Sequence, residues 1–271
     1  MLKVQYRMLI LDIDGTLRPT GELRIPKENA EAVCAVQKLG VKIVIATGRC
    51  RAEVPKGMLR SIRPDYWICA AGAEVLDGKG AELYSQRLSQ EEMYALVDYC
   101  EDHEYPLGFS YSDGAYVYVE YAKMRRHELD AGLVTSLRDG EDQDRHLQDM
   151  PFSAFARLSC PAVACFQEKY GYLGLRFLHY SDEGCDIVRP NQDKAVGLQE
   201  LLAATGFSAQ DCVAVGDGSN DVGLLRMVGE SFCMQGGNEL ALAAAGRQCP
   251  TASACGVVSV CREVWPEAFA L

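Results

Sequence analysis

The feature that most constrains the fold is a set of short apolar runs, distant in the sequence, that each end directly on polar residues and glycine. Three of these runs are MLILDI at 8–13, VKIVIA at 41–46 and CVAV at 212–215. Continuous apolar stretches of this length are typical of strands buried on both faces of a parallel sheet. Helical patterns at 26–39 and 193–204 alternate with them, which predicts an α/β fold with helices covering a parallel sheet.

The pattern changes near residue 80 and returns near residue 190. In between, a helical pattern at 90–103 precedes a hairpin signal at Asp113-Gly114, and further strand patterns follow. This mixture favours an α+β domain of antiparallel style. We therefore expect a Rossmann-like core with a parallel sheet, built from 1–80 and 189–271, and an inserted α+β domain at 81–188.

The composition argues against several classes of partner. The formal net charge is −11, whereas proteins that bind nucleic acid or anionic membranes need basic surface. No apolar run is long enough to span a membrane, and the N-terminal segment reads as a strand rather than a signal peptide. The twelve cysteines are scattered without a CxxC pair, as in reduced cytoplasmic proteins. We expect a cytoplasmic protein without nucleic-acid or membrane partners, either a monomer or a small homo-oligomer.

Three carboxylates follow the predicted strands. Asp12 and Asp14 end the first run, and Asp217 comes shortly after the run at 212–215. In open α/β sheets, ligands bind at the carboxyl ends of the strands, and residues i and i+2 of a strand share a face. Carboxylates at such close range repel one another, and a hard divalent cation removes that repulsion. Oxygen ligands without nearby His or Cys suit Mg²⁺, which commonly bridges protein carboxylates to a phosphate group.

The same strand ends also offer donors for a phosphate group. Thr47 provides a hydroxyl, and the backbone of Gly48 lies beside it. Lys194 stands at the expected start of a helix, where free N–H groups and the helix dipole favour anions. Asp12 can then act as a nucleophile that forms an aspartyl-phosphate, while Asp14 can protonate the leaving oxygen and activate water.

Four segments resemble the signature motifs of the haloacid dehalogenase (HAD) superfamily. Asp12-Ile-Asp14-Gly15-Thr16 is similar to the DxDGT motif, and Thr47-Gly48-Arg49 to the second motif. Lys194 corresponds to the third motif, and the segment from Gly216 to Asp221 to the GDxxND motif. Their order resembles the Cof-type phosphatases, which carry a type IIB α+β cap between the second and third motifs. The resemblance implies a HAD-like catalytic core and a cap domain.

The resemblance also implies a role for each matching residue. Asp12 would be the nucleophile and Asp14 the general acid and base. The metal ligands for Mg²⁺ would be Asp12, Asp14 through its backbone carbonyl, Asp217 and, indirectly, Asp221. The phosphate would be held by Thr47, Gly48, Lys194 and Asn220. The implied activity is Mg²⁺-dependent hydrolysis of small phosphorylated metabolites such as sugar phosphates.

Other functions on this fold stay open. A phosphomutase of the phosphomannomutase type shares the nucleophile and the cap style, but it needs a second phosphate site, for which Arg125 and Arg126 are candidates. A non-catalytic phosphate-binding regulator would be expected to lack Asp12 or Asp14, and both are present. A receiver domain uses a similar acidic pocket, but the inserted domain and the DxDGT spacing argue against it.

Some positions depart from the pattern or have plainer explanations. Ala71 stands where Cof-type sequences usually have Asn, so the contacts at the mouth of the site are open. Arg49 suits a phosphate contact and a structural ion pair equally. The alternating tyrosines from Tyr111 to Tyr121 are typical of packing in a half-buried hairpin. We interpret the acidic run from Asp139 to Asp149 as a solvated loop.

Overall fold

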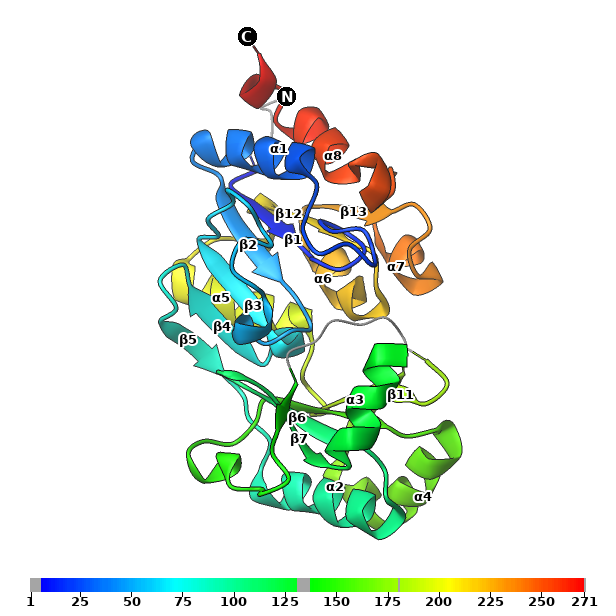
Figure 1. The fold of residues 1–271 in the computed structure, drawn as a ribbon. Coiled ribbons are helices and arrows are strands. Elements are labelled where there is room, and N and C mark those ends of the chain that lie inside the picture. Colours follow the sequence, from blue (N-terminus) through cyan, green and yellow to red (C-terminus); the bar gives the residue numbers. More distant parts are fainter. Residues whose placement is uncertain (1–5, 131–136, 180, 271) are drawn as a thin grey trace. The chain divides into compact units, whose positions relative to one another are not determined.

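The computed structural model describes residues 6–130, 137–179 and 181–270, which divide into two compact units (Figure 1). The first unit combines the described residues up to Gly48 with Pro55–Tyr84 and the chain from Asp193 onward. The second unit consists of Arg49–Val54 and Ser85–Gln192. Residues 49–54 therefore cluster with the second unit, although they lie inside the range 1–80 predicted for the core.

The first unit is built on an eight-stranded sheet with the order β14-β13-β12-β1-β2-β3-β4-β5. Its parallel strands are β1 (Met8–Leu11), β2 (Lys42–Ala46), β3 (Tyr66–Cys69), β12 (Cys212–Gly216), β13 (Glu230–Met234) and β14 (Arg247–Cys249). Strand β4 (Glu74–Asp77) runs antiparallel to β3, and β5 (Glu82–Ser85) lies at the edge. Strand β1 pairs with β2 on one side and β12 on the other, so it lies inside the sheet.

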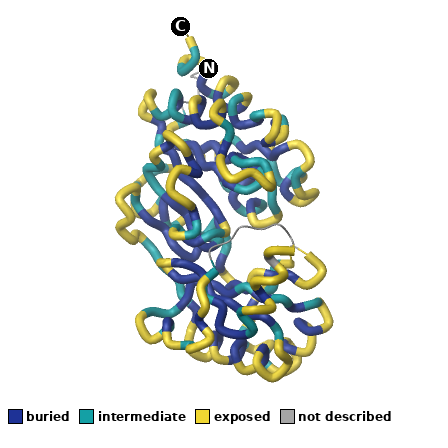
Figure 2. The backbone as a smooth tube through the Cα atoms, in the orientation of Figure 1, coloured by how far each residue is buried: buried dark blue, intermediate teal, exposed yellow. Residues whose placement is uncertain are grey.

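Among its described residues, this unit has five α-helices: α1 (Lys27–Lys38), α5 (Lys194–Thr205), α6 (Val222–Met227), α7 (Glu239–Ala244) and α8 (Gly256–Val264). Met8 and Ile10 of β1 pack in one apolar cluster with Leu198 of α5 and helix α6. Leu9 and Leu11 point to the opposite face and are also fully buried, so β1 is covered on both faces. Figure 2 colours the backbone of both units by burial. This burial explains the continuous apolar run, and the predicted α/β fold is confirmed.

The second unit has a six-stranded sheet with the order β10-β11-β9-β6-β7-β8. The strands are β6 (Leu107–Tyr111), β7 (Gly114–Val119), β8 (Arg138–Asp139), β9 (Ser153–Arg157), β10 (Arg176–His179) and β11 (Gly184–Val188), and the helices are α2 (Gln90–His103), α3 (Tyr121–Asp130) and α4 (Cys160–Tyr170). Residues of α2 and α4 pack with the sheet in one apolar core. The hairpin turn comes one residue earlier than predicted, because Gly114 already pairs with Tyr111. In the described parts of both units, no helix is long and apolar enough to cross a bilayer.

The segment 138–150 is mostly an exposed loop, as predicted, but one of its arginines is buried. Arg145 is buried, its Nη2 donates to Asp113 Oδ1 at 2.9 Å, and its Nη1 pairs with Asp149. The guanidinium also lies 4.5 Å from the centre of the Tyr111 ring. The burial of Arg145 was not predicted, because charge patterning along the chain does not show that one arginine folds inward between two carboxylates. The packing expected for the tyrosines is confirmed at Tyr111 and Tyr118, which are buried.

Candidate active site

The carboxyl ends of β1, β2 and β12 lie at the same edge of the first unit's sheet. Leu11 pairs with Ile45 of β2 and with Val215 of β12, so the three strands end in register. One residue further, the Asp12 backbone N–H donates to Val215 O at 3.1 Å and continues the ladder. The polar segments that begin at Asp12, Thr47 and Asp217 therefore leave the sheet beside one another.

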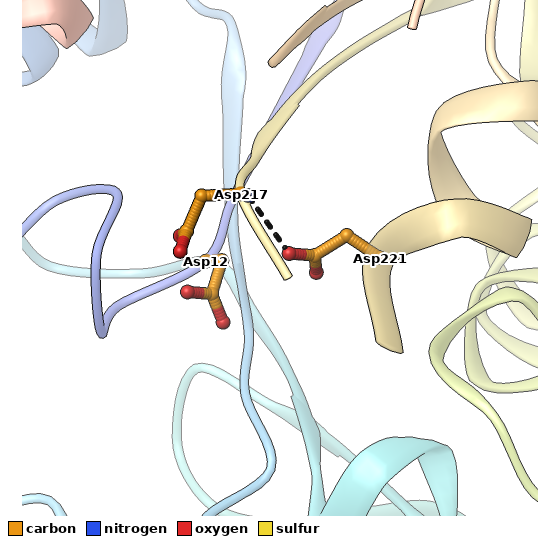
Figure 3. A group of neighbouring side chains, drawn as sticks. All are labelled: Asp12, Asp217 and Asp221. Atoms are coloured by element: carbon orange, nitrogen blue, oxygen red, sulfur yellow. Dashed lines mark hydrogen bonds between the residues drawn. The ribbon is translucent and has the colours of Figure 1, made fainter. Parts of the chain in front are cut away.

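Asp12, Asp217 and Asp221 converge at this edge, as Figure 3 shows. Each offers one carboxylate oxygen, and these oxygens all lie within 4.8 Å of one another. Asp221 Oδ2 accepts hydrogen bonds from the backbone N–H groups of Asp217 at 3.0 Å and Gly218 at 2.9 Å. Asp221 therefore fixes the loop after β12 that carries Asp217.

Lys194 is the cationic member of this cluster. Its Nζ donates to Asp12 Oδ1 and to Asp221 Oδ1, both at 2.6 Å, and its side chain is completely buried. Lys194 is the first residue of helix α5. The preceding Asp193 caps this helix, because its carboxylate accepts a hydrogen bond from Val196 N at 2.9 Å. The sequence placed Lys194 at a helix start, and the structure adds that its ammonium group joins two carboxylates.

The charges of the cluster do not balance. Burial raises the pKa of Asp12 to about 8; the charge of Lys194 opposes this shift, and those of Asp221 and Asp217 add to it. Burial also raises the pKa of Asp217 to about 6. Burial alone would lower the pKa of Lys194, but the charges of Asp12 and Asp221 raise it above its usual range. Three carboxylates share one ammonium group, so either a proton or a further cation is needed.

A divalent cation fits this donor set. The converging ligands are all carboxylate oxygens, which hard divalent cations prefer. A cavity of about 290 Å³ opens beside Asp217, between the loops that follow β1 and β13, and leaves room for metal-bound water. Its lining includes Gly15, Thr20, Asp217, Gln235, Gly236 and Ser253. Enzymes of the haloacid dehalogenase superfamily, which this sequence resembles, generally use a divalent metal. This cluster is where such an ion would bind.

Thr16 bonds Asp217 and Gly15 leaves room for it, and neither role was predicted from the sequence. The Thr16 hydroxyl donates to Asp217 Oδ1 at 2.6 Å. Gly15 has φ of 89°, and a Cβ at this position would lie 2.2 Å from Asp217 Oδ2, so only glycine fits. The Gly-Thr pair of the DxDGT motif was the sequence signal for these roles. Glycine allows a left-handed backbone, and a buried threonine hydroxyl needs a hydrogen-bond partner.

The carboxylate of Asp14 is directed elsewhere. It is not a member of the converging group, and its Oδ1 accepts a hydrogen bond from Arg18 Nε at 3.0 Å. Arg18 Nη2 contacts the same oxygen. The sequence predicted Asp14 beside Asp12 but missed Arg18, whose spacing of four residues gives no signal in a segment that is not helical.

Three predicted phosphate-binding residues lie around the cluster. Thr47 is buried directly after β2, and its backbone N–H donates to Ile68 O at 2.8 Å. A Cβ on Gly48 would lie 3.8 Å from Asn220 Nδ2, so these two residues are neighbours.

Ala71 lies in a turn that connects Thr47 with the start of α5. Ala70 and Ala71 have φ of 48° and 52°, and Gly72 has φ of 97°. Ala71 N donates to Thr47 O at 3.1 Å, and a Cβ on Gly72 would lie 1.9 Å from Asp193 O. Asn tolerates left-handed backbone better than Ala does. The Asn that is usual here in related sequences therefore suits the backbone of this turn.

Comparison with known proteins supports the resemblance to the haloacid dehalogenase superfamily. Residues 9–260 match the haloacid dehalogenase-like hydrolase family. A relative from Haemophilus influenzae, named as a candidate phosphatase, is 27% identical over 240 residues, which cover 86% of this chain and 87% of that protein.

Solved structures share the fold. A phosphatase of the HAD superfamily from Bacteroides thetaiotaomicron has a TM-score of 0.84 at 19% identity and covers 97% of this chain and 96% of its own. A subclass IIB sugar phosphatase of the superfamily has a TM-score of 0.81 at 23% identity, with 95% and 98% covered. The predicted family membership is confirmed: the chain belongs to the haloacid dehalogenase-like hydrolase family, and its named relatives support an enzyme of the phosphatase type.

Proposed function

We propose that this protein is a Mg²⁺-dependent phosphomonoester hydrolase that acts on small phosphorylated metabolites, with Asp12 as its covalent nucleophile. The observation that carries the proposal is the buried cluster in which Lys194 bonds Asp12 at 2.6 Å beside Asp217 and Asp221. Such a cluster places a nucleophilic oxygen beside an ammonium group and beside carboxylates that would hold a cation, and phosphoryl transfer requires positive charge next to the nucleophile.

The reaction would proceed in two displacements. In the first, an Asp12 oxygen bonds to phosphorus, the bond from phosphorus to the ester oxygen breaks, and Asp14 gives that leaving oxygen its proton. In the second, Asp14 takes a proton from a water molecule whose oxygen attacks the phosphorus. The bond to Asp12 then breaks and inorganic phosphate leaves. Both carboxyl groups end in the state in which they began.

The remaining residues would bind and neutralise the phosphoryl group. Lys194, Thr47, Gly48 and Asn220 would donate to its oxygens. Asp12, Asp217 and the backbone carbonyl of Asp14 would hold Mg²⁺, with Asp221 supporting it indirectly. The bound ion supplies positive charge against the phosphate oxygens.

We propose that residues 1–80 and 189–271 form the catalytic core and that residues 81–188 form a cap that selects the leaving group. A sugar phosphate is our preferred substrate class, because a structural relative is described as a sugar phosphatase. The net charge of −11 supports an enzyme without nucleic-acid or membrane partners, as a monomer or a small homo-oligomer. All twelve cysteines, each within the described residues, are free thiols, which supports a cytoplasmic location.

A hydrolysis screen tests the proposal. Purified protein is assayed for phosphate release from a panel of phosphorylated metabolites with Mg²⁺ and with EDTA, beside Asp12→Asn and the control Asp98→Asn on the exposed face of α2. We expect activity in the wild type and the control, and none with EDTA or in Asp12→Asn. Equal phosphate release by wild type and Asp12→Asn would rule out the mechanism. Isomerisation that depends on a sugar bisphosphate, without net phosphate release, would identify the phosphomutase alternative.

A further inference from the structure

The cavity of about 290 Å³ beside Asp217 has walls that take no part in the proposed reaction. Three loops contribute most of these walls: one follows β1, one follows β13 and one follows β14. All of the lining residues belong to the first unit. The cavity is therefore a property of the core unit alone.

The cavity connects solvent with one member of the charged cluster. Four of its lining residues are exposed: Thr20, Gln235, Thr251 and Ser253. Asp217 also lines the cavity and is half-buried. The side chains of Lys194, Asp221 and Asp12 are only 0%, 1% and 8% exposed, and none of these three residues lines the cavity. Water in the cavity therefore meets the cluster at Asp217.

The carboxylate of Asp217 lies at the wall of this cavity. Gly15 lines the cavity as well, and a Cβ on Gly15 would lie 2.2 Å from Asp217 Oδ2. Asp217 Oδ1 is engaged by the hydroxyl of Thr16 at 2.6 Å. Oδ2 is thus the Asp217 oxygen that lies against a glycine of the cavity wall, where an arriving cation would meet it.

The lining suits a hydrated cation better than an anion. Its polar side chains are three hydroxyls, one amide and the carboxylate of Asp217, and no lysine, arginine or histidine of the described chain lines it. A phosphate group would meet this carboxylate without a compensating positive charge. Mg²⁺ gives up water reluctantly and keeps several water ligands. Six waters fill about 180 Å³ at about 30 Å³ each, so the hydrated ion fits in a cavity of about 290 Å³.

We propose that this cavity is the route by which the hydrated divalent cation and its water ligands reach Asp217 and leave it again. The inference rests on the proposed function, because it requires that the carboxylate cluster binds the ion. The phosphorylated substrate does not share this route, since the lining offers it no positive charge. Thr20 and Ser253, which lie on different loops, are the mouth residues that limit the width of the route.

A route sets the rates of binding and release but not the affinity. A large side chain at the mouth leaves the ligands of the ion unchanged, so it should slow binding and release by the same factor. Because Kd is the ratio of the two rate constants, Kd should stay as it is. If the mouth residues helped to hold the ion instead, their replacement would change Kd.

The test fills the mouth from two sides with Ser253→Trp and Thr20→Trp. Ser253 is the exposed middle residue of the 3₁₀-helix Ala252–Ala254, and Gln210→Trp, in the middle of the 3₁₀-helix Ala209–Asp211, is the matched control. Mn²⁺ is the probe, because it prefers the same oxygen ligands as Mg²⁺. Each protein is loaded with Mn²⁺ and mixed rapidly with an excess of a fluorescent chelator, whose quenching reports the release of the ion. Titration followed by electron paramagnetic resonance gives Kd.

Both filled variants should release Mn²⁺ about tenfold more slowly than the wild type, which corresponds to an opening cost of about 1.4 kcal/mol. Their Kd should be unchanged, and Gln210→Trp should behave as the wild type. Release at or above the wild-type rate in both filled variants would overturn the proposal. Slower release with a proportionally tighter Kd would also overturn it, because it would show that the added ring holds the ion.

Two filled variants keep the test decisive if one of them does not fold, which thermal unfolding reveals. Failure of the proposed function is distinguishable from failure of the route. In that case the wild type itself would bind no Mn²⁺, or would release no phosphate in the hydrolysis screen, whatever the filled variants do.

Discussion

The hydroxyl of Thr16 donates a 2.6 Å hydrogen bond to Asp217 Oδ1, which joins two motifs that lie 201 residues apart. Thr16 is fully buried, and Asp217 is an expected metal ligand. The bond fixes the direction of the Asp217 carboxylate at the carboxyl end of the sheet. Outer partners of metal ligands commonly matter nearly as much as the ligands themselves.

Thr16→Val should therefore weaken Mg²⁺ binding while the protein stays folded. Valine keeps the shape of threonine but removes the donor, and losing such a partner lowers metal affinity by about 10–100-fold. Isothermal titration calorimetry with Mg²⁺ measures the effect. Thr205→Val serves as the control, because it removes a hydroxyl that bonds Leu201 O at the far end of α5. Unchanged Mg²⁺ affinity in Thr16→Val would show that the bond is structural only.

Lys194→Met should abolish activity and destabilise the protein. The substitution leaves Asp12 and Asp221 buried without their cationic partner, and breaking a buried ion pair costs about 3–5 kcal/mol. Urea unfolding of the metal-free protein measures this loss. The double variant Lys194→Met with Asp221→Asn should recover part of the stability but none of the activity. A loss below about 1 kcal/mol, which is typical of exposed pairs, would contradict the expected burial of charge.

The metal-free protein should lose stability as the pH rises from about 4 to about 8. The folded-state pKa of Asp12 is raised from 3.8 to about 8, so in this window the folded state binds a proton that the unfolded state has released. The stabilising contribution is complete below pH 3.8 and is lost as the pH passes through the raised pKa. Melting temperatures in EDTA between pH 5 and 9 measure the slope. Asp12→Asn should show a smaller slope than the wild type, and Mg²⁺ should reduce the slope of the wild type.

Ala71→Asn should stabilise the protein by about 0.5–1 kcal/mol, because Ala in the left-handed region is strained by about 1–2 kcal/mol and Asn tolerates that region. The φ of Ala71 is 52°. Ala81→Asn, at an exposed loop position outside the residues with positive φ, is the control and should give no gain. Urea unfolding distinguishes the two. Equal effects of both substitutions would show that backbone strain at Ala71 is not the cause.

Gly72→Ala should have the opposite effect in the same turn. The φ of Gly72 is 97°, and the added Cβ would lie 1.9 Å from Asp193 O, directly before Lys194. Backbone must move to relieve this overlap, so we expect lower stability together with a lower kcat. Gly80→Ala, at φ of 90° with nothing within 4 Å of its Cβ, isolates the cost of the dihedral angle alone. If both variants lose the same stability and neither loses activity, the close approach of the turn to α5 is unimportant.

Local sequence patterns determined the framework of this protein. The run at 8–13 predicts a buried strand because its residues must be apolar on both faces, and β1 is covered on both faces as expected. Strands of a parallel sheet end at one edge, so the order of the motifs was enough to bring Asp12, Asp217 and Lys194 to one place. The charge and spacing of these three residues also indicated sites for a cation and a phosphate group, because aspartates and a lysine brought together in this way serve few other functions.

Tertiary structure alone decided where individual side chains point. Arg18 turns towards Asp14 because a tight turn brings them together, and their separation of four residues outside a helix predicts no contact. Arg145 is buried between Asp113 and Asp149, although an acidic run suggests a solvated loop. The left-handed backbone of Ala71 follows from the packing of its turn against Asp193. Apolar periodicity is a property of neighbouring residues in the chain, whereas the direction of a polar side chain depends on partners that only the folded protein supplies.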